Sequence, residues 1–501
     1  MGRSGVDVGI SGFCGGGIFI GDLSHLGYLG NMKIIADFHL HSKYSRAVSE
    51  KMILPEIARW AKLKGLDLVG TADWTHPVWV RELKSQLKEA APGVFRVREG
   101  KEGREGREGK EGEREPLFLL VTEIASIYSQ KGRTYKIHNL VLAPDFEAVE
   151  KINAELTRRG VNLIADGRPI TGISARDLAE LIFSIDEKCV IIPAHVWTPW
   201  FSLYGSNSGF DSLEECFGDL AKSIYAIETG LSSDPEMNWR IGELDNRQIV
   251  SFSDAHSGAN LGREATVFAL SENRISNFQF PISKISYKDI TSAIKNDSVG
   301  KLKIAYTIEF YPQEGKYHYT GHRNCQVRQS PEETKKLGKT CPVCGKPLTV
   351  GVLHRVEQLS NRTIEQLDEK IVEKTDQFGV KQIKWGNRPG YVMLVPLAEI
   401  IAKVKGVGKL SKSVMEGYVR VIRGIREIGE IRGELGILLE APLEEIAKVG
   451  GEKLAEGISR VRAGEVHIEP GYDGVYGEVK VWPAFAKASA GKPEKEQMSL
   501  F

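Results

Sequence analysis

The segment IADFHLHSKYSRA, residues 35–47, begins in a short apolar run and carries two histidines one residue apart. In an extended chain, residues i and i+2 point to the same face, so His39 and His41 can reach one metal ion together from a strand end. A lone His-x-His pair also occurs as an ordinary polar surface patch. The choice between the two interpretations depends on whether further metal-binding residues follow downstream.

The overall composition is that of a soluble globular protein too long for one hydrophobic core. The chain has 501 residues, 41% hydrophobic and 27% charged, so we expect about two to four domains. A formal net charge of +1 offers no global charge argument for nucleic acid binding. Six mostly scattered cysteines are typical of a reducing cytoplasm. No apolar run reaches about 18 residues, so no membrane association is predicted.

Between residues 32 and 300, short β-rich runs alternate with amphipathic helical stretches. One expected helix, LPEIARWAKLKG, has Pro55 in its first turn and Gly65 at its end. This alternation predicts an α/β fold with a mainly parallel sheet or a barrel. The runs are KIIADFH, LDLVGTADW, LFLLVTEI, YKIHNLVLA, VIIPAHVW, IYAIETG and IVSFSDAH.

Most of these runs contain or end in a side chain that can bind a metal ion. Barrel enzymes place such residues at the carboxyl ends of their strands, where they share one site. The same pattern in seven runs is much stronger evidence for a metal centre than one His-x-His pair. The candidate residues are Asp37, His39, His41, Asp73, Glu123, His138, His195, Glu228, Asp254 and His256.

Two segments near the start of the chain are predicted to stay outside the folded core. Residues 1–31 are glycine-rich and are expected to be a disordered leader, or to precede the natural start at Met32. Residues 98–115, REGKEGREGREGKEGERE, contain no apolar side chain, which predicts a disordered surface insertion.

A different metal motif occurs in residues 301–360. A histidine and three cysteines form two pairs, each with two intervening residues, which is typical of a zinc ribbon that holds a structural Zn²⁺ between four protein ligands. His318 is a competing candidate for the histidine, and a chance arrangement is the alternative. The predicted ligands are His322, Cys325, Cys341 and Cys344.

Residues 361–480 are predicted to be helical and internally repeated. PLAEIIAKVKGVGKLSKSV begins at Pro396, and PLEEIAKVGGEKLAEGI begins at Pro442. Glycine turns that expose amides at a helix start can bind phosphate, as in helix-hairpin-helix motifs of non-specific DNA binding. A helical bundle with glycine turns is the alternative. The candidate DNA contacts are Gly406, Gly408, Lys409, Gly450, Gly451 and Lys453.

Together, the strand-end residues resemble the metal ligands of the PHP (polymerase and histidinol phosphatase) superfamily. The order of barrel, zinc ribbon and helical domain resembles the endonuclease Q family over residues 32–480, in segments such as GTADWTHP, IPAHVWTPWFSLYGS, SFSDAHS and CPVCGKPLTVGVLHRVEQL. The resemblance implies a distorted (β/α)₇ barrel with a multinuclear centre of Mg²⁺, Mn²⁺ or Zn²⁺. It also implies hydrolysis of DNA 5′ of uracil, hypoxanthine, xanthine or an abasic site.

The resemblance implies roles for single residues. Asp254, Glu123 and His195 would be catalytic, and Glu123 would bridge two ions. A third ion would lie near Asp73 and His256. The first ion would be held by His39, His41, Glu123 and Asp254, and the second by Glu123, His138 and His195.

Two positions depart from the superfamily pattern. Trp74 stands where a metal-binding histidine is usual, and Arg46 stands where an aspartate is usual. His76 could substitute for the missing histidine. The third ion is therefore the one that the sequence supports least.

Partners are predicted from two aromatic residues and from the end of the chain. Trp197 and Trp200 follow His195 and could stack on a base taken out of a damaged double- or single-stranded DNA, or they could simply cover the barrel mouth. The flexible tail, residues 481–501, ends in QMSLF, which resembles the pentapeptide that binds a bacterial sliding clamp; its contact residues would be Gln497, Met498, Leu500 and Phe501.

Two other functions fit parts of the sequence. A PHP phosphatase acting on small molecules needs only the barrel and leaves the ribbon and the repeated hairpins unexplained. A non-catalytic DNA-binding scaffold is disfavoured by the intact set of metal ligands.

Overall fold

The computed structural model describes residues 33–98, 114–271, 281–428 and 431–482. The predicted leader, nearly all of the charged insertion and the clamp-binding tail lie outside the described residues, so these three expectations stay predictions. Within the described ranges, no helix combines the length and apolarity needed to span a membrane.

Each of the seven predicted runs contains a strand, and the mixed α/β class is confirmed. Helix α1 (Leu54–Lys64) begins with Pro55 and ends at Gly65, whose φ of 82° places it in the left-handed region favoured by glycine. The strands are β1 (Lys33–Asp37), β2 (Leu68–Gly70), β5 (Leu117–Gln130), β6 (Arg133–Ala143), β8 (Val190–Pro193), β9 (Ala226–Glu228) and β10 (Gln248–Val250).

The sheet is less parallel than the sequence predicts. β1 pairs with β2, and β2 with β5, in parallel, whereas β6 is antiparallel to both β5 and β8. Only Lys131 and Gly132, with φ of 49° and 76°, separate β5 from β6. A two-residue turn of this kind makes a hairpin and is too short for a parallel crossover.

Contacts just beyond the strands gather their carboxyl ends at one end of the fold. The amide of Val196, after β8, donates to the carbonyl of Glu228 at the end of β9 over 3.1 Å. Leu40, after β1, forms a parallel bridge with Ala255, after β10. The site described below is built at this end, while closure into a strict (β/α)₇ barrel stays a prediction.

The main sheet continues past the predicted domain boundary at residue 300. Two strands from the predicted zinc-binding and helical segments pair with it directly: β12 joins β11, and β17 joins β12. Sequence regions assigned to later domains therefore complete the first one. The added strands are β11 (Ala265–Leu270), β12 (Leu302–Glu309), β15 (Ile371–Thr375), β16 (Lys381–Trp385) and β17 (Gly390–Met393).

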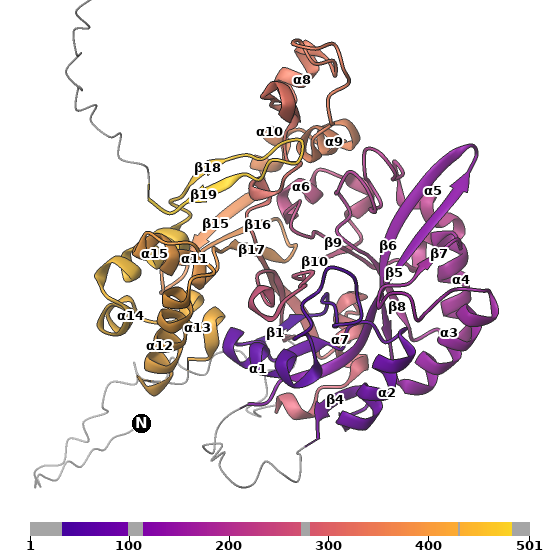
Figure 1. Ribbon diagram of the computed structural model, residues 1–501, viewed down its shortest axis with the longest axis horizontal. Helices are drawn as coiled ribbons and strands as arrows, with labels where there is room; N and C mark the ends of the chain where they lie inside the picture. Colours follow the sequence, from indigo (N-terminus) through magenta and orange to yellow (C-terminus); the bar gives the residue numbers. More distant parts are fainter. Residues whose placement is uncertain (1–32, 99–113, 272–280, 429–430, 483–501) are drawn as a thin grey trace, which may run out of the picture.

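Five helices form a group on one side of the sheet, drawn in gold and orange in Figure 1. A buried ion pair joins this group to helix α1, because Lys64 Nζ at the end of α1 lies 2.5 Å from Glu434 Oε2 in α13. α8 (Pro331–Leu337) and α9 (Val352–Leu359) project elsewhere, at the top of the same view. The grouped helices are α11 (Leu397–Lys405), α12 (Lys412–Ile428), α13 (Gly433–Leu439), α14 (Leu443–Gly450) and α15 (Glu452–Ala463).

Candidate metal centre

Seven of the eight predicted barrel ligands meet at one end of the fold: five follow the carboxyl ends of strands, and Glu123 and His138 lie within β5 and β6. They form three overlapping groups, in each of which the candidate ligand atoms lie within 4.8 Å of one another. The groups are His39, His41 and Glu123; Glu123, His138 and His195; and His41, Asp254 and His256.

Glu123, in the middle of β5, lies at the centre of the cluster. Its Oε1 is 2.7 Å from His138 Nδ1 and 3.1 Å from His195 Nε2. Its Oε2 is 3.4 Å from His41 Nε2. One carboxylate with two oxygens facing different histidines has the geometry needed to bridge two cations.

Four buried polar atoms of the cluster lie close to one another or to Glu123, but none of them makes a hydrogen bond of normal geometry within the described chain. Each such atom costs about 1–3 kcal/mol when it is buried without a partner. Imidazole nitrogens and carboxylate oxygens are ligands of divalent ions, so bound metal would satisfy all four atoms. The residues therefore fit a metal centre. The atoms are Nε2 of His39, Nε2 of His41, Nδ1 of His138 and Oδ1 of Asp254.

Two further carboxylates orient the histidines from behind. Glu228 Oε1 accepts a hydrogen bond from His39 Nδ1 at 2.9 Å, and Asp73 Oδ1 accepts one from His41 Nδ1 at 3.1 Å. Asp73, which the sequence predicts as a metal ligand, directs its other oxygen to the Ser42 amide and hydroxyl at 2.6 Å. The structure thus gives Asp73 a supporting position, of the kind that fixes ring orientation and raises ligand basicity.

Neighbouring carboxylates raise the pKa of His39 and of His41 by more than burial lowers it. Burial lowers the pKa of His41, but the nearby carboxylates of Asp254 and Asp73 raise it to about 9. Burial also acts against the proton on His39, yet the charge of Glu228 helps to hold its pKa well above the usual value. The surroundings of His39 and His41 thus favour positive charge.

Arg168 belongs to the site although no sequence pattern indicates it. Its Nη1 donates to Glu123 Oε2 at 3.1 Å, and 23% of its side chain is exposed. Burial opposes ionisation of Glu123, but His138 and Arg168 together keep the pKa of that carboxyl well below its ordinary range. A guanidinium at the edge of the cluster can also donate to a phosphate oxygen.

Three residues of the site adopt left-handed backbone conformations. The φ angle is 33° at Asp73, 33° at His195 and 46° at Asp254. Such a conformation costs a non-glycine residue about 1–2 kcal/mol, and residues of this kind cluster at functional sites. Gly230 allows one of them, because a Cβ there would lie 2.3 Å from the Cβ of His195.

His76 does not replace the histidine that the superfamily pattern would place at Trp74. Its ring stacks on Tyr44, with 4.2 Å between ring centres, and its side chain caps helix α2 (Pro77–Gln86). Trp74 itself is fully buried in the apolar core. The third group uses His256 instead.

The prediction that Trp197 contacts DNA is wrong. Its indole N–H donates to Asn238 Oδ1 at 2.8 Å, and its ring stacks on Tyr204 inside the core. Packing rather than a partner molecule occupies this side chain. Trp200 is 37% exposed and meets the ring of Tyr317 edge-on, so it stays a candidate contact.

Solved structures match most of this architecture. The crystal structure of the lesion-specific endonuclease PfuEndoQ from Pyrococcus furiosus is 33% identical to this chain, with a TM-score of 0.70 over 90% of this chain and 95% of that one. The chain belongs to the endonuclease Q family. The predictions of this family and of a metal-dependent DNA endonuclease are both confirmed.

Further matches agree with this family. An endonuclease Q structure in complex with a 27-mer duplex that carries an abasic lesion at the active site is also 33% identical, with a TM-score of 0.70 over 90% of this chain and 96% of that one. The uncharacterized protein YqxK of Bacillus subtilis is 27% identical over 459 residues, 89% of this chain and 99% of that protein.

An archaeal relative matches over a shorter region. The uncharacterized protein MJ0043 of Methanocaldococcus jannaschii is 34% identical over 289 residues, 57% of this chain and 31% of that protein's length. The family model described as the MJ0043 C-terminal domain matches residues 396–465, which comprise helices α11 to α15.

This endonuclease Q family member has a separate metal-type cluster near α8. The ligand atoms of its four members lie within 4.8 Å of one another, and Cys344 Sγ is 3.4 Å from His322 Nδ1. The competing candidate, His318, is buried against Tyr319 and is not part of the group. The geometry therefore favours His322. The cluster consists of His322, Cys325, Cys341 and Cys344.

The two sequence repeats fold as two helix–turn–helix units. α11 ends at Gly406, with a φ of 67°, and Gly451, with a φ of 90°, separates α14 from α15. A Cβ at Gly406, Gly408 or Gly451 would meet no atom within 4 Å. These three positions are open, whereas a Cβ at Gly450 would lie 2.4 Å from Leu454 Cδ2. The role of the turns in binding DNA stays a prediction.

Proposed function

We propose that this chain nicks DNA at deaminated bases (uracil, hypoxanthine and xanthine) and at abasic sites, by metal-dependent hydrolysis on the 5′ side of the lesion. The observation that carries the proposal is the convergence, at one end of the fold of an endonuclease Q family member, of four buried ligand atoms that make no hydrogen bond of normal geometry. A decayed barrel would have no reason to keep polar atoms buried without partners.

In this proposal the three groups hold Mg²⁺, Mn²⁺ or Zn²⁺. Such ions would neutralise the phosphodiester, lower the pKa of bound water and stabilise the leaving oxygen. Glu123 would bind two ions, while Glu228 and Asp73 keep the Nε2 atoms of His39 and His41 directed at the centre. Asp254, Glu123 and His195 are the proposed catalytic residues.

The rest of the chain would hold the DNA. Arg168 would donate to an oxygen of the scissile phosphate, and Trp200 would stack near the extruded base. The glycine turns of the helical repeats would bind backbone phosphates through their amides, with Lys409 and Lys453 adding charge. A structural Zn²⁺ would hold the ribbon, and a sliding clamp is the proposed partner of the terminal pentapeptide on sequence grounds alone.

A nicking assay on a panel of substrates tests the proposal. Duplexes with a uracil, a hypoxanthine, an abasic site or no lesion are incubated with the protein and Mg²⁺ or Mn²⁺, beside a small phosphomonoester. Metal-dependent nicking of the damaged duplexes alone is expected. Hydrolysis of the phosphomonoester without nicking would favour a phosphatase, and binding without nicking would favour a scaffold.

A further inference from the structure

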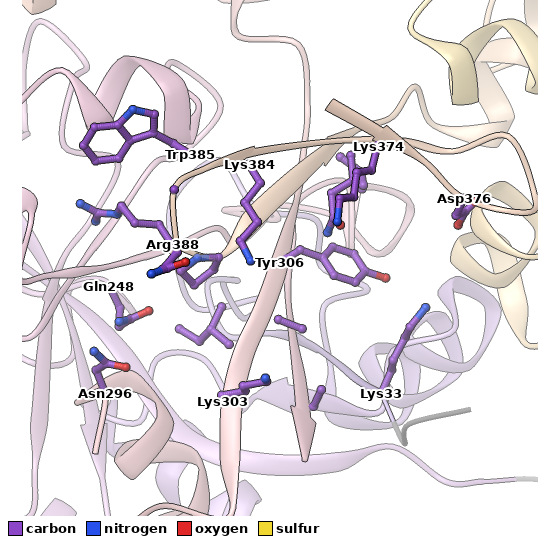
Figure 2. A pocket seen from close by; sticks show the side chains of 18 of the residues that line it. Lys33, Gln248, Asn296, Lys303, Tyr306, Lys374, Asp376, Lys384, Trp385 and Arg388 are labelled. Carbon is purple, nitrogen blue, oxygen red and sulfur yellow. The ribbon is translucent and has the colours of Figure 1, made fainter. Parts of the chain in front are cut away.

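A large cationic pocket, drawn in Figure 2, lies at the start of strands β1, β10 and β12. Its volume is about 1020 Å³. It is lined by Lys33, the first residue of β1, by Gln248, the first residue of β10, and by Lys303 near the start of β12. The metal ligands follow the carboxyl ends of β1 and β10, so the two sites lie at opposite ends of these strands.

The two sites are too far apart for one bound group to contact both. β1 alone has 5 residues, and a strand of that length spans about 16 Å. A phosphate bound at the metal centre therefore cannot contact the pocket at the same time. The pocket needs an explanation independent of the scissile phosphate.

One wall of the pocket is the basic face of the hairpin formed by β15 and β16. Lys374 is the register partner of Gln382, and Lys384 lies two residues further along, so the three side chains share one face. Figure 2 shows Lys374 and Lys384 directed into the cavity from this wall. The opposite face of the same hairpin carries Lys381, which pairs with Glu373 at 2.7 Å.

The lining has a strong excess of positive charge. Each of its two acidic residues already has partners: Asp245 pairs with Arg362 and with Arg388 of the lining itself, and Asp376 accepts hydrogen bonds from two backbone amides of its own turn. Lys33 in turn pairs with Glu440, which lies outside the lining. In the ranges that the structure describes, neither Lys374 nor Lys384 forms an ion pair. The cationic residues are Lys33, Arg247, Lys303, Lys370, Lys374, Lys384 and Arg388.

A concave surface that concentrates like charges attracts anions, and its size sets the class of anion. The volume suits a nucleotide, and the ring of Tyr306 lies beside Lys33 in the lining. We propose that this pocket is a second anion site that binds the phosphates of a nucleotide, either free in solution or within a nucleic acid strand. The proposal goes beyond the proposed nuclease function, because it concerns the other end of the fold.

Calorimetric titration of the full chain, without added divalent metal, tests the proposal with tripolyphosphate, ATP and a short oligothymidylate as probes. Replacing Lys374 and Lys384 together by Ala is expected to weaken binding by about tenfold or more. Both lysines are exposed, so the core is unaffected. The matched control, Lys381→Ala on the opposite face, is expected to bind like the wild type. Tighter binding of ATP than of the oligonucleotide would identify a free nucleotide, and the reverse order a strand.

Three results would overturn the proposal. The first is that the wild type binds none of the probes, and the second is that the double variant and the control bind them with equal affinity. The third is that binding of the probes is lost in Asp254→Asn but kept in the double variant, because the phosphates would then occupy the metal centre. Nicking separates this proposal from the nuclease function, since the double variant is expected to nick a damaged duplex at the wild-type rate.

Discussion

His41 contacts a carboxylate at each end of its ring, and replacing these two carboxylates is expected to have different effects on nicking. Nδ1 lies 3.1 Å from Asp73 and Nε2 lies 3.2 Å from Asp254. Asp254→Asn removes a ligand, so it is expected to abolish nicking at every metal concentration while DNA binding persists. Asp73→Asn keeps the ligands and is expected to weaken metal affinity by about 10–100-fold, so excess Mn²⁺ should restore nicking.

Metal titrations of the nicking rate compare the two variants directly, with gel shifts as the control for DNA binding. Recovery of Asp254→Asn at high Mn²⁺ would remove it from the ligand set. An Asp73→Asn variant with unchanged metal dependence would show that the hydrogen bond to His41 does not tune the centre.

A buried carboxyl group beneath the centre makes stability depend on pH. Burial raises the pKa of Glu309 from 4.5 to about 8, although hydroxyls of Ser251 and Thr307 donate to it. Because the folded-state pKa is the higher one, this group favours folding below pH 4.5, and that contribution is lost as the pH rises through about 8. Glu309→Gln does not titrate and should gain stability relative to wild type as the pH rises.

Chemical denaturation of the wild type and of Glu309→Gln at about pH 5 and about pH 9 measures the free energy of unfolding of each protein. Between these pH values the stability of the variant relative to wild type is expected to rise by more than about 1 kcal/mol. A difference between the two proteins that is the same at both pH values would contradict the raised pKa of Glu309.

Among single residues, ligand chemistry makes most of the metal centre predictable from the sequence, because only a few residue types at strand ends can bind a metal. Sequence alone does not separate a ligand from a carboxylate behind it: it predicts Asp73 as a ligand, whereas in the structure the oxygens of Asp73 contact His41 and Ser42. It could not find Arg168, since no spacing marks an arginine that contacts a bridging glutamate. Burial of Trp197 depends on tertiary packing, which its neighbours in sequence do not reveal.

Among the elements, the ribbon around β13 (Thr320–His322) and α8 has little apolar material to hold it. Leu337 and Val343 are 66% and 69% exposed. Structural zinc supplies folding free energy in such domains, so Cys341→Ser is expected to lose the metal and to unfold at a lower temperature. Elemental analysis and thermal unfolding measure both effects, with Val343→Ser as the control outside the ligand set. Wild-type protein without tightly bound zinc would contradict the assignment.

A further prediction concerns DNA binding by the glycine turns of the helical group. Lys409 and Lys453 are exposed beside the open glycine turns. If each contacts a phosphate, its replacement by Ala should flatten the slope of log affinity against log salt by about 0.9. Damaged and intact duplexes should be affected alike, while nicking at saturating DNA is unchanged. Lys448→Ala on the surface of α14 is the matched control, and an unaltered salt slope in the hairpin variants would exclude these contacts.

Element existence was easier to predict than element pairing. Apolar runs bounded by polar residues located all seven strands, and Pro55 with Gly65 located α1. The antiparallel pairing of β6 follows from the two-residue turn at Lys131 and Gly132, which the prediction of a mainly parallel sheet does not consider. The joining of β15–β17 to a sheet that begins at Lys33 depends on contacts between distant segments, which local sequence does not encode.

For the whole molecule, the attachment of the helical group to the sheet fixes where DNA could lie. Glu434 accepts hydrogen bonds from Lys64 and from the hydroxyl of Tyr418, all three being buried. Breaking a buried pair from one side costs about 3–5 kcal/mol. The helical hairpins are therefore held at a defined position relative to the strand-end cluster, as a nuclease that grips and cuts one duplex requires.

Mapping the cut on an end-labelled duplex with a single uracil tests most directly whether the strand-end cluster hydrolyses DNA. Wild-type protein with Mn²⁺ is expected to give one product, broken at the phosphodiester on the 5′ side of the uracil. The same duplex should stay intact with chelator, with Asp254→Asn, or when thymine replaces the uracil. Equal cleavage of the undamaged duplex, or the same cut made by Asp254→Asn, would contradict a lesion-specific nuclease built on this metal centre.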